Sequence, residues 1–288
     1  MPPPRRKRLK RRRSSCSTFG CGVFVLGLTA VLVLLGLYFL APLRTNLLIL
    51  GIDYAPPGSL AGRSDTIILM SINPLKPQVA MLSIPRDLWV NIPGIGENRI
   101  NTAHFFAEAQ QPGAGPGKAL ETVRQNFGLG VGYYLRVKFE GFKEVVDALG
   151  GVTIDLQVPM AGYPAGRHHL TGNKALAFAR SRMGTDDFFR MEQGQLLVKS
   201  VLRQMLNPGY WPRLPAVTLA FMRSVDTNIP VWLWPRLMLA LLRTGPDGID
   251  NRTIQRTMVT PFTTDLGASI LLPDWGQIHL LIAEMFGG

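Results

Sequence analysis

Three short apolar runs between residues 45 and 90 constrain the fold of this chain most strongly. The first, TNLLILGID, ends at Asp53; the second begins at Asp65 and continues as TIILMSI; the third, QVAMLSI, is followed by Arg86. Each run is rich in Ile, Leu, Met and Val and short enough for a buried strand. The Pro-rich turn at residues 73–77 predicts that the second and third strands fold back on each other. If the loop from Asp53 to Asp65 also reverses the chain, then Asp53, Asp65 and Arg86 converge at one edge of a sheet.

Such a convergence suits a divalent metal ion next to a phosphate. Two carboxylates are hard oxygen ligands, and a guanidinium donates two parallel hydrogen bonds to phosphate oxygens. The alternative is that Asp53, Asp65 and Arg86 are ordinary charges at strand ends, because short motifs carry a risk of false matches. Asp87 is the one candidate for a general base, although orienting the neighbouring Arg86 is the simpler role for it.

An uncharged stretch of 22 residues, Phe19–Leu40, follows a strongly basic tail. About 20 apolar residues cross the hydrocarbon core of a bilayer, so residues 19–40 are predicted to form a transmembrane helix. No A-x-A cleavage pattern follows it, which favours an uncleaved anchor. Residues 5–13 hold eight basic residues. Basic residues stay on the cytoplasmic side, so the tail (1–18) is predicted inside and residues 45–288 outside.

The charge of the rest of the chain is modest. Removing those eight residues from the formal net charge of +12 leaves +4. Attraction to anionic lipid and control of topology explain a basic tail beside a membrane helix, so nucleic acid is not expected as a partner. Both cysteines, Cys16 and Cys21, lie at the membrane boundary. The outer part therefore has no disulfide framework.

Strands and helices alternate after residue 90, which indicates an α/β domain. No polar linker separates residues 207–288 from the rest, so 45–288 is predicted to be one domain. Loops are expected at 91–101 and around His168–His169. The periodicity and the turn residues predict helices at 102–109, 117–127, 140–149, 171–180, 188–206, 231–242 and 274–286, and strands at 132–139, 152–158 and 254–259.

A second group of charges lies in the segment ALAFARSRMGTDDFFR. Arg180 and Arg182 flank the end of one predicted helix, and Arg190 lies near the start of the next. Three arginines from one helix–loop–helix can bind a diphosphate, aided by the N-terminus of the second helix. The alternative, which this segment alone favours, is that the arginines pair on the surface with the nearby acidic residues Asp186, Asp187 and Glu192.

The order of the motifs carries more information than any one of them. GID, RSDTIILMSINP, SIPRDLWVNIP, NRINTAHFF, VDALGGVTIDL, LTGNKALAFARSR and DDFFR follow one another along the chain. This order resembles the LytR-CpsA-Psr family of membrane-anchored cell-wall phosphotransferases. The resemblance covers residues 45–206, and DTNIP and LLPDW look like its continuation. The combination of RSDT, SIPRD and the R-x-R segment is the specific part.

The resemblance implies a fold and an activity. The fold is an α/β/α sandwich around a central mixed sheet, in a single extracytoplasmic domain preceded by one transmembrane helix. The activity is the Mg²⁺-dependent transfer of a glycopolymer, such as teichoic acid or capsule, from a polyprenyl-diphosphate carrier to a peptidoglycan hydroxyl. By motif, Asp53 and Asp65 correspond to the Mg²⁺-associated aspartates of the family. Arg86, Arg182 and Arg190 correspond to its catalytic, diphosphate-binding arginines, and Arg180 joins the diphosphate-binding group.

The chain departs from the family pattern at two places. Family members often have an arginine soon after the first aspartate, where this chain has 54–57 (YAPP); R-Q-Q is usual where it has Gln193 and Gly194. Two other functions stay open: a diphosphate hydrolase using the same site, and a non-catalytic polyprenyl-lipid-binding protein. His104, His168 and His169 are not expected to form a catalytic set.

Overall fold

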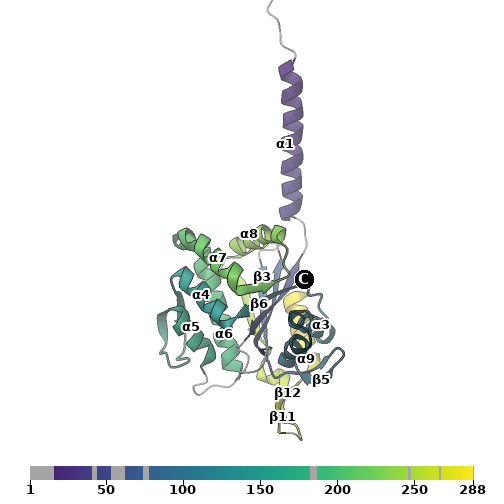
Figure 1. The fold of residues 1–288 in the computed structure, drawn as a ribbon, viewed down its shortest axis with the longest axis vertical. Coiled ribbons are helices and arrows are strands. Elements are labelled where there is room, and N and C mark those ends of the chain that lie inside the picture. Colours follow the sequence, from purple (N-terminus) through teal and green to yellow (C-terminus); the bar gives the residue numbers. More distant parts are fainter. Residues whose placement is uncertain are drawn as a thin grey trace, which may run out of the picture. The chain divides into compact units, whose positions relative to one another are not determined.

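The computed structural model describes residues 16–40, 44–52, 62–73, 78–181, 187–245, 248–265 and 267–287. The chain divides into two compact units, Met1–Ala41 and Pro42–Gly288. The first unit contains helix α1 (Cys16–Leu40) (Figure 1). Its Gly22–Phe39 segment has a mean hydropathy of 2.4. Among the described residues, α1 alone is long and apolar enough to cross a membrane.

A six-stranded mixed sheet forms the centre of the second unit (Figure 1), in the strand order β10-β3-β2-β1-β6-β9. The antiparallel pairs are β1 with β2, β2 with β3 and β6 with β9, whereas β1 with β6 and β3 with β10 are parallel. The strands are β1 (Thr45–Ile52), β2 (Ser64–Asn73), β3 (Gln78–Ile84), β6 (Tyr133–Lys138), β9 (Val225–Thr227) and β10 (Ile249–Thr253).

Helices cover both faces of this sheet. Leu48, Leu50 and Leu82 pack on one face with α2 (Asn101–Gln110), α3 (Gly115–Phe127) and α9 (Trp275–Phe286). Leu47 and Met81 pack on the other face with α6 (Asp187–Leu206) and α8 (Trp234–Thr244). Successive strand residues point to opposite faces, so near-continuous apolar strands belong in a sheet that is covered on both sides. The predicted α/β/α arrangement around a mixed sheet is confirmed.

A further group of elements packs outside α6. It shares two apolar clusters with that helix, one around Phe178 and one around Leu149 and Val217. Its members are α4 (Phe139–Leu149), α5 (Gly172–Arg180), a 3₁₀ turn (Pro208–Arg213), α7 (Leu214–Ser224) and the hairpin of β7 (Val152–Leu156) and β8 (Gly166–Leu170).

Two segments that the sequence predicts as loops contain strands. The segment 91–101 holds most of a hairpin in which β4 (Trp89–Ile92) pairs with β5 (Gly96–Arg99). Gly94 and Gly96 adopt φ values of 76° and 100° in and beside its turn, which glycine tolerates without steric cost. The segment around His168 is strand β8, paired with β7. Four- and five-residue strands rich in polar residues lack the apolar alternation that identifies longer ones.

The predicted strand at 254–259 is wrong. β10 ends at Thr253, residues Arg256–Met258 form a 3₁₀ turn, and β11 (Val259–Thr263) then pairs with β12 (Ser269–Pro273). Ile254 is fully buried, and its N–H donates to the Ser83 carbonyl at 3.1 Å. Its apolar character therefore reflects packing just beyond the edge strand β10, not a strand of its own.

A buried polar network fixes the segment that leads into β2. The Nδ1 atom of His104 lies 3.1 Å from the Gly62 carbonyl oxygen, and the Arg136 Nη1 atom lies 3.4 Å from His104 Nε2. Arg136 also binds the carboxylates of Glu108 at 3.0 Å and Asp226 at 2.8 Å. A guanidinium only donates, so Nε2 is the acceptor and Nδ1–H donates to Gly62. A neutral His104 thus ties α2 to the backbone three residues before Asp65.

Stability should therefore fall on the acid side. Burial lowers the pKa of His104 below its ordinary value of 6.5, and Arg136 lowers it further, against smaller raising effects of Gly62, Glu108 and Asp226. Below pH 6.5 the unfolded chain binds more protons at this site than the folded chain, so the free energy of unfolding decreases as the pH falls. His104→Gln should flatten the decline of melting temperature from pH 7 to pH 5.

His279→Gln is the matched control for that measurement, because His279 is an exposed histidine on α9. It should keep the wild-type slope of melting temperature against pH. An unchanged slope in His104→Gln would show that protonation of His104 does not contribute to acid destabilisation.

Candidate functional site

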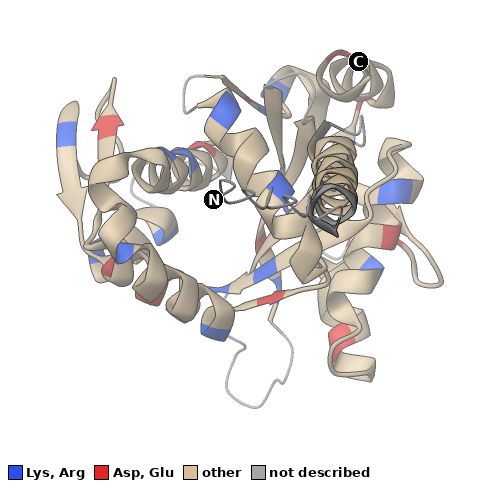
Figure 2. Cartoon of the chain, turned by 90° about the horizontal axis from the view of Figure 1, so that it is seen from above, with Lys and Arg blue, Asp and Glu red and all other residues tan. Residues whose placement is uncertain are grey.

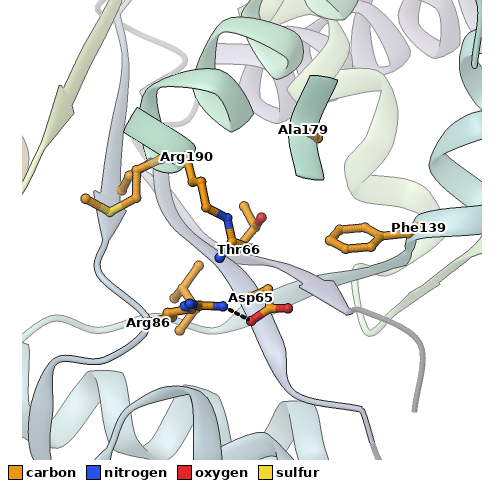
Figure 3. Close-up of a pocket in the computed structure, with 9 residues that line it drawn as sticks. Asp65, Thr66, Arg86, Phe139, Ala179 and Arg190 are labelled. Carbon is orange, nitrogen blue, oxygen red and sulfur yellow. Dashed lines mark hydrogen bonds and ion pairs between the residues drawn. The ribbon is translucent and has the colours of Figure 1, made fainter. Parts of the chain in front are cut away.

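A pocket lies where the ends of several elements meet (Figure 3). Strands β2 and β3 contribute to it, together with the start of α4, the end of α5 and the start of α6. Its walls combine charged, hydroxyl and apolar side chains. The lining residues are Asp65, Thr66, Ile67, Ser83, Arg86, Phe139, Ala179, Arg190 and Met191.

The register of the three opening strands brings Asp65 and Arg86 together. Ile52 pairs with Ser64, and Ile67 pairs with Ile84, so the end of β1, the start of β2 and the end of β3 lie side by side at the same end of the sheet. The Asp65 Oδ1 atom accepts a hydrogen bond from Arg86 Nη1 at 2.8 Å. Their side chains are 13% and 22% exposed. The pair is therefore half-buried and still accessible from the pocket.

Arg86 is held from several sides. Its Nε atom lies 3.5 Å from Asp87 Oδ2, and Asp87 Oδ1 accepts from Arg99 Nη1 at 3.3 Å. The Arg86 carbonyl accepts from the N–H of Asn101, the first residue of α2, at 3.2 Å. These contacts fix both the backbone and the guanidinium plane of Arg86. Asp87 is shared between two arginines, an arrangement that orients Arg86.

Two more arginines approach from the helices above the strand ends. Arg190, in the first turn of α6, extends toward Thr66 and the Asp65–Arg86 pair (Figure 3). Arg180, the last residue of α5, places its Cζ atom 4.8 Å from the ring centre of Phe139. That cation–π contact sets Arg180 against one wall of the pocket. Residues about a hundred positions apart in the chain thus bring positive charge to one place.

Some of the predicted site residues lie outside the described part of the chain. These are Asp53, which directly follows β1, and Arg182 and Asp186 between α5 and α6. Within the described ranges, no three His, Cys, Asp or Glu side chains lie close enough together to hold a metal ion. A complete carboxylate cage for a metal is therefore not built from those ranges.

The structure adds residues to the site that the sequence did not indicate. Ser83 lines the pocket with its hydroxyl group buried and, among the described residues, without a hydrogen-bond partner. The one feature of the sequence that points to Ser83 is that it is a polar residue inside the apolar run QVAMLSI. A Cβ atom at Gly51 would lie 2.9 Å from the Thr66 Cβ atom and 3.4 Å from the Phe139 ring. Glycine at position 51 therefore allows Phe139 and Thr66 to approach β1 closely.

Gln193 is one of the positions at which the chain departs from the family pattern, and the structure shows its surroundings. It lies one helical turn after Arg190 and is fully buried, and both amide atoms lack a hydrogen-bond partner among the described residues. Gln195, two residues further, donates from Nε2 to the Arg252 carbonyl at 2.5 Å. The chain thus places a buried neutral amide where a further arginine is usual.

The arrangement suits a phosphate group with a bound Mg²⁺. Guanidinium groups donate charge-assisted hydrogen bonds to phosphate oxygens. Asp65 Oδ1 is taken by Arg86, but Oδ2 accepts no hydrogen bond from the described residues. Mg²⁺ binds one or two carboxylates and completes its shell with water and substrate phosphate oxygens. A partly accessible carboxylate beside a pocket lined by two guanidinium groups fits that donor set.

Comparison with known proteins assigns most of the chain to one family. A profile of the LytR-CpsA-Psr family matches residues 42–271. The chain is 45% identical over 141 residues to the polyisoprenyl-teichoic acid–peptidoglycan teichoic acid transferase TagU of Oceanobacillus iheyensis, covering 48% of this chain and 43% of that protein. It is 30% identical over 195 residues to the regulatory protein MsrR of Staphylococcus aureus, covering 65% of this chain and 57% of MsrR. The chain thus matches about half the length of each relative.

Solved structures share the fold. TagV of B. subtilis superposes with a TM-score of 0.70 at 23% identity, covering 85% of this chain and 98% of TagV. TagT bound to LIIa-WTA superposes with a TM-score of 0.67 at 21% identity, covering 85% of this chain and 91% of TagT. The family match extends over well more than half of the chain and contains the whole pocket. The chain belongs to the LytR-CpsA-Psr family.

Proposed function

We propose that this chain is a membrane-anchored phosphotransferase that moves a glycopolymer from a polyprenyl-diphosphate carrier to a peptidoglycan hydroxyl. The observation that carries the proposal is the meeting of Asp65, Arg86 and Arg190 in one pocket of a LytR-CpsA-Psr protein. A relative is named as a teichoic acid transferase to peptidoglycan, and TagT has been solved with LIIa-WTA. Both facts support a lipid-linked glycopolymer as the substrate class.

The residues of the pocket would bind the diphosphate and stabilise the leaving group. Arg86 and Arg190 bind the diphosphate oxygens, with Arg180 and Arg182 in the same group. The acceptor hydroxyl forms a bond to the phosphorus that bears the glycopolymer and loses its proton to solvent water, and the bond from that phosphorus to the bridging oxygen breaks. Polyprenyl phosphate leaves with the negative charge that the guanidinium groups stabilise. Phosphoryl transfer depends mainly on such positioning and electrostatic stabilisation.

Asp65, together with Asp53, would hold Mg²⁺ in this site. A bound Mg²⁺ neutralises charge on phosphate oxygens. Asp65 Oδ1 also accepts a hydrogen bond from Arg86 at 2.8 Å. The carboxylate therefore helps to hold the guanidinium in place.

The proposed location is the cell membrane, with one pass and residues 45–288 outside the cytoplasm. It rests on the uncharged Phe19–Leu40 stretch and on the eight basic residues at 5–13. Basic residues elsewhere are dispersed among acidic ones (Figure 2), unlike the single basic stripe of a nucleic-acid surface. Protease added to intact spheroplasts should digest the large unit, and full protection would overturn this orientation.

Arginine variants test the transfer reaction. A charge-assisted hydrogen bond contributes about 1.5 to 3 kcal/mol, so Arg190→Ala should lower kcat/KM about tenfold or more. Arg86→Ala should do the same. Arg190→Lys should restore little, because an ammonium group cannot reproduce the two parallel bonds of a guanidinium. Steady-state kinetics with a lipid-linked diphosphate substrate measure this.

Arg167→Ala is the matched control for these arginine variants. Arg167 is exposed on β8 and does not line the pocket, so its removal should leave kcat/KM unchanged. Thermal melting of every variant separates folding defects from catalytic ones. Wild-type kinetics in Arg86→Ala and Arg190→Ala, with lowered melting temperatures, would make the two arginines structural and would refute the proposed diphosphate site.

Asp65→Asn tests the metal. The amide keeps the shape of the carboxylate but is a poor ligand for Mg²⁺, so turnover should fall sharply and its dependence on Mg²⁺ should weaken. Binding of Mn²⁺, measured by electron paramagnetic resonance, reports on the metal site without any turnover. Asp155→Asn, an exposed carboxylate on β7, should retain both properties. Activity that does not change between chelator and excess Mg²⁺ would remove the metal from the proposal.

Product analysis distinguishes the transferase from a hydrolase at the same site. With labelled lipid-linked substrate and peptidoglycan present, a transferase leaves the label on the peptidoglycan. A hydrolase releases it as free phosphorylated glycopolymer, because water replaces the acceptor hydroxyl.

A further inference from the structure

Helix α8 is apolar on two opposite sides, and only one of them is covered within the second unit. Leu233, just before the helix, and Leu237, Ala240 and Leu241 are buried against the sheet. A helix that is apolar all round belongs in a protein core or in contact with lipid. The outward stripe consists of Val231 and Trp232, in the 3₁₀ turn just before the helix (Val231–Leu233), and of Pro235, Leu239 and Leu242 on the helix itself.

The outward stripe is well exposed. Val231 is 84% exposed, Trp232 61%, Leu242 45% and Leu239 37%. The exposed positions 232, 235, 239 and 242 recur at the spacing of one helical face. A tryptophan in such a place has an apolar ring and one N–H, the combination enriched at membrane–water interfaces.

The neighbouring helix α7 has the same character. The Phe221 ring lies 5.4 Å from the Trp234 ring in an edge-to-face contact, which sets the end of α7 beside the start of α8. On α7, Leu219 is 51% and Met222 73% exposed. The uncovered apolar surface therefore extends beyond one helix.

The exposed charges of α7 and α8 are basic. Residues 207–244 contain four arginines, of which Arg236 is buried, and a single acidic residue, Asp226. Asp226 is already bound by Arg136 at 2.8 Å. Arg223 and Arg243 are exposed at the C-terminal ends of α7 and α8. Apolar residues edged by arginine match the surface of a bilayer that contains anionic lipid.

α8 packs on the sheet near the start of β1, where the chain enters the second unit. Its buried residues pack with Leu47, Ile72 and Val79. Thr45 pairs with Ile72, and Ile72 pairs with Val79, so these residues mark the end of the sheet where β1 begins. Leu40, the last residue of α1, lies five positions before Thr45. Five residues span at most about 18 Å, so this end of the sheet is tethered close to any membrane that holds α1.

We propose that α8 docks on the bilayer in which the chain is anchored. Its outward stripe lies in the interfacial layer, with Trp232, Leu239 and Leu242 among the upper parts of the acyl chains. Arg243 lies among anionic headgroups. The proposal rests on the membrane anchor of the proposed function, but not on the transfer reaction.

Tryptophan fluorescence of the full chain tests the docking directly. The chain has five tryptophans, none of them in α1. In vesicles of phosphatidylcholine and phosphatidylglycerol, lipids with a bromine or nitroxide group near the headgroup should quench the fluorescence. Trp232→Phe should remove about half or more of the quenched signal, because an interfacial ring is within reach of the label. Trp89→Phe, in strand β4, should leave the quenched amount unchanged.

Glutamate substitutions within the outward stripe and outside it form a matched pair of variants. Leu239→Glu combined with Leu242→Glu should abolish the quenching, since both side chains would enter the apolar layer. Leu280→Glu on α9, where Leu280 is 73% exposed, should retain it. Arg243→Gln should shift the docked-to-undocked ratio about fivefold in anionic vesicles, as one basic residue contributes about 1 kcal/mol there, and should have no effect in pure phosphatidylcholine.

Two outcomes would overturn the proposal. One is quenching that is absent or insensitive to Trp232→Phe. The other is self-association of the full chain in detergent that the Leu239→Glu, Leu242→Glu variant abolishes, because a second copy would then cover the stripe. Quenching is measured without substrate, so loss of docking and lack of transferase activity are separate results.

Discussion

The antiparallel register of β1, β2 and β3 is the constraint on which the site depends. Because Ile67 pairs with Ile84 and Ile52 pairs with Ser64, Asp65 and Arg86 emerge at the same edge. A slip of one residue would turn every side chain of a strand to the other face, so the buried apolar residues on both faces also fix the charged ones. The resulting ion pair is largely buried, so Arg86 requires an anionic partner at this position. A phosphate oxygen that took the place of the Asp65 carboxylate would keep Arg86 paired.

The sequence predicts the parts of this fold whose signals are local. The three opening strands follow from their apolar runs and turns, and the convergence of Asp65 with Arg86 follows from strand reversal. Arg190 was assigned to the site from the order of the motifs, because nothing in the sequence around α6 shows that its first turn lies over the start of β2. Ser83 and Phe139 were not identified, since a hydroxyl inside a strand and a phenylalanine at a helix start look like ordinary core residues until the packing is known.

Non-local pairing accounts for most of the wrong expectations. β8, with its two histidines, is a strand because β7 offers it hydrogen-bond partners, and its own residues do not indicate this. β10 is only five residues long and lies at an edge of the sheet. There, β3 provides the hydrogen-bond partners of β10. The strand was predicted at 254–259 instead because Ile254, just beyond β10, is strongly apolar. Short edge strands are polar enough to resemble loops, which also protects them from pairing with other chains.

The two ends of the central sheet differ in chemistry, and this difference links the pocket to the proposed docking. Charged and hydroxyl residues gather where β1 ends, whereas α8, which carries the outward apolar stripe, packs over the end where β1 begins. β1 has eight residues, which at about 3.3 Å each separate the two ends by roughly 25 Å. A domain docked through α8 would hold its pocket about that far from the bilayer surface. Under the proposed function, the acceptor in the wall would approach the pocket from the side away from the lipid, and the polyprenyl chain would have to span this distance.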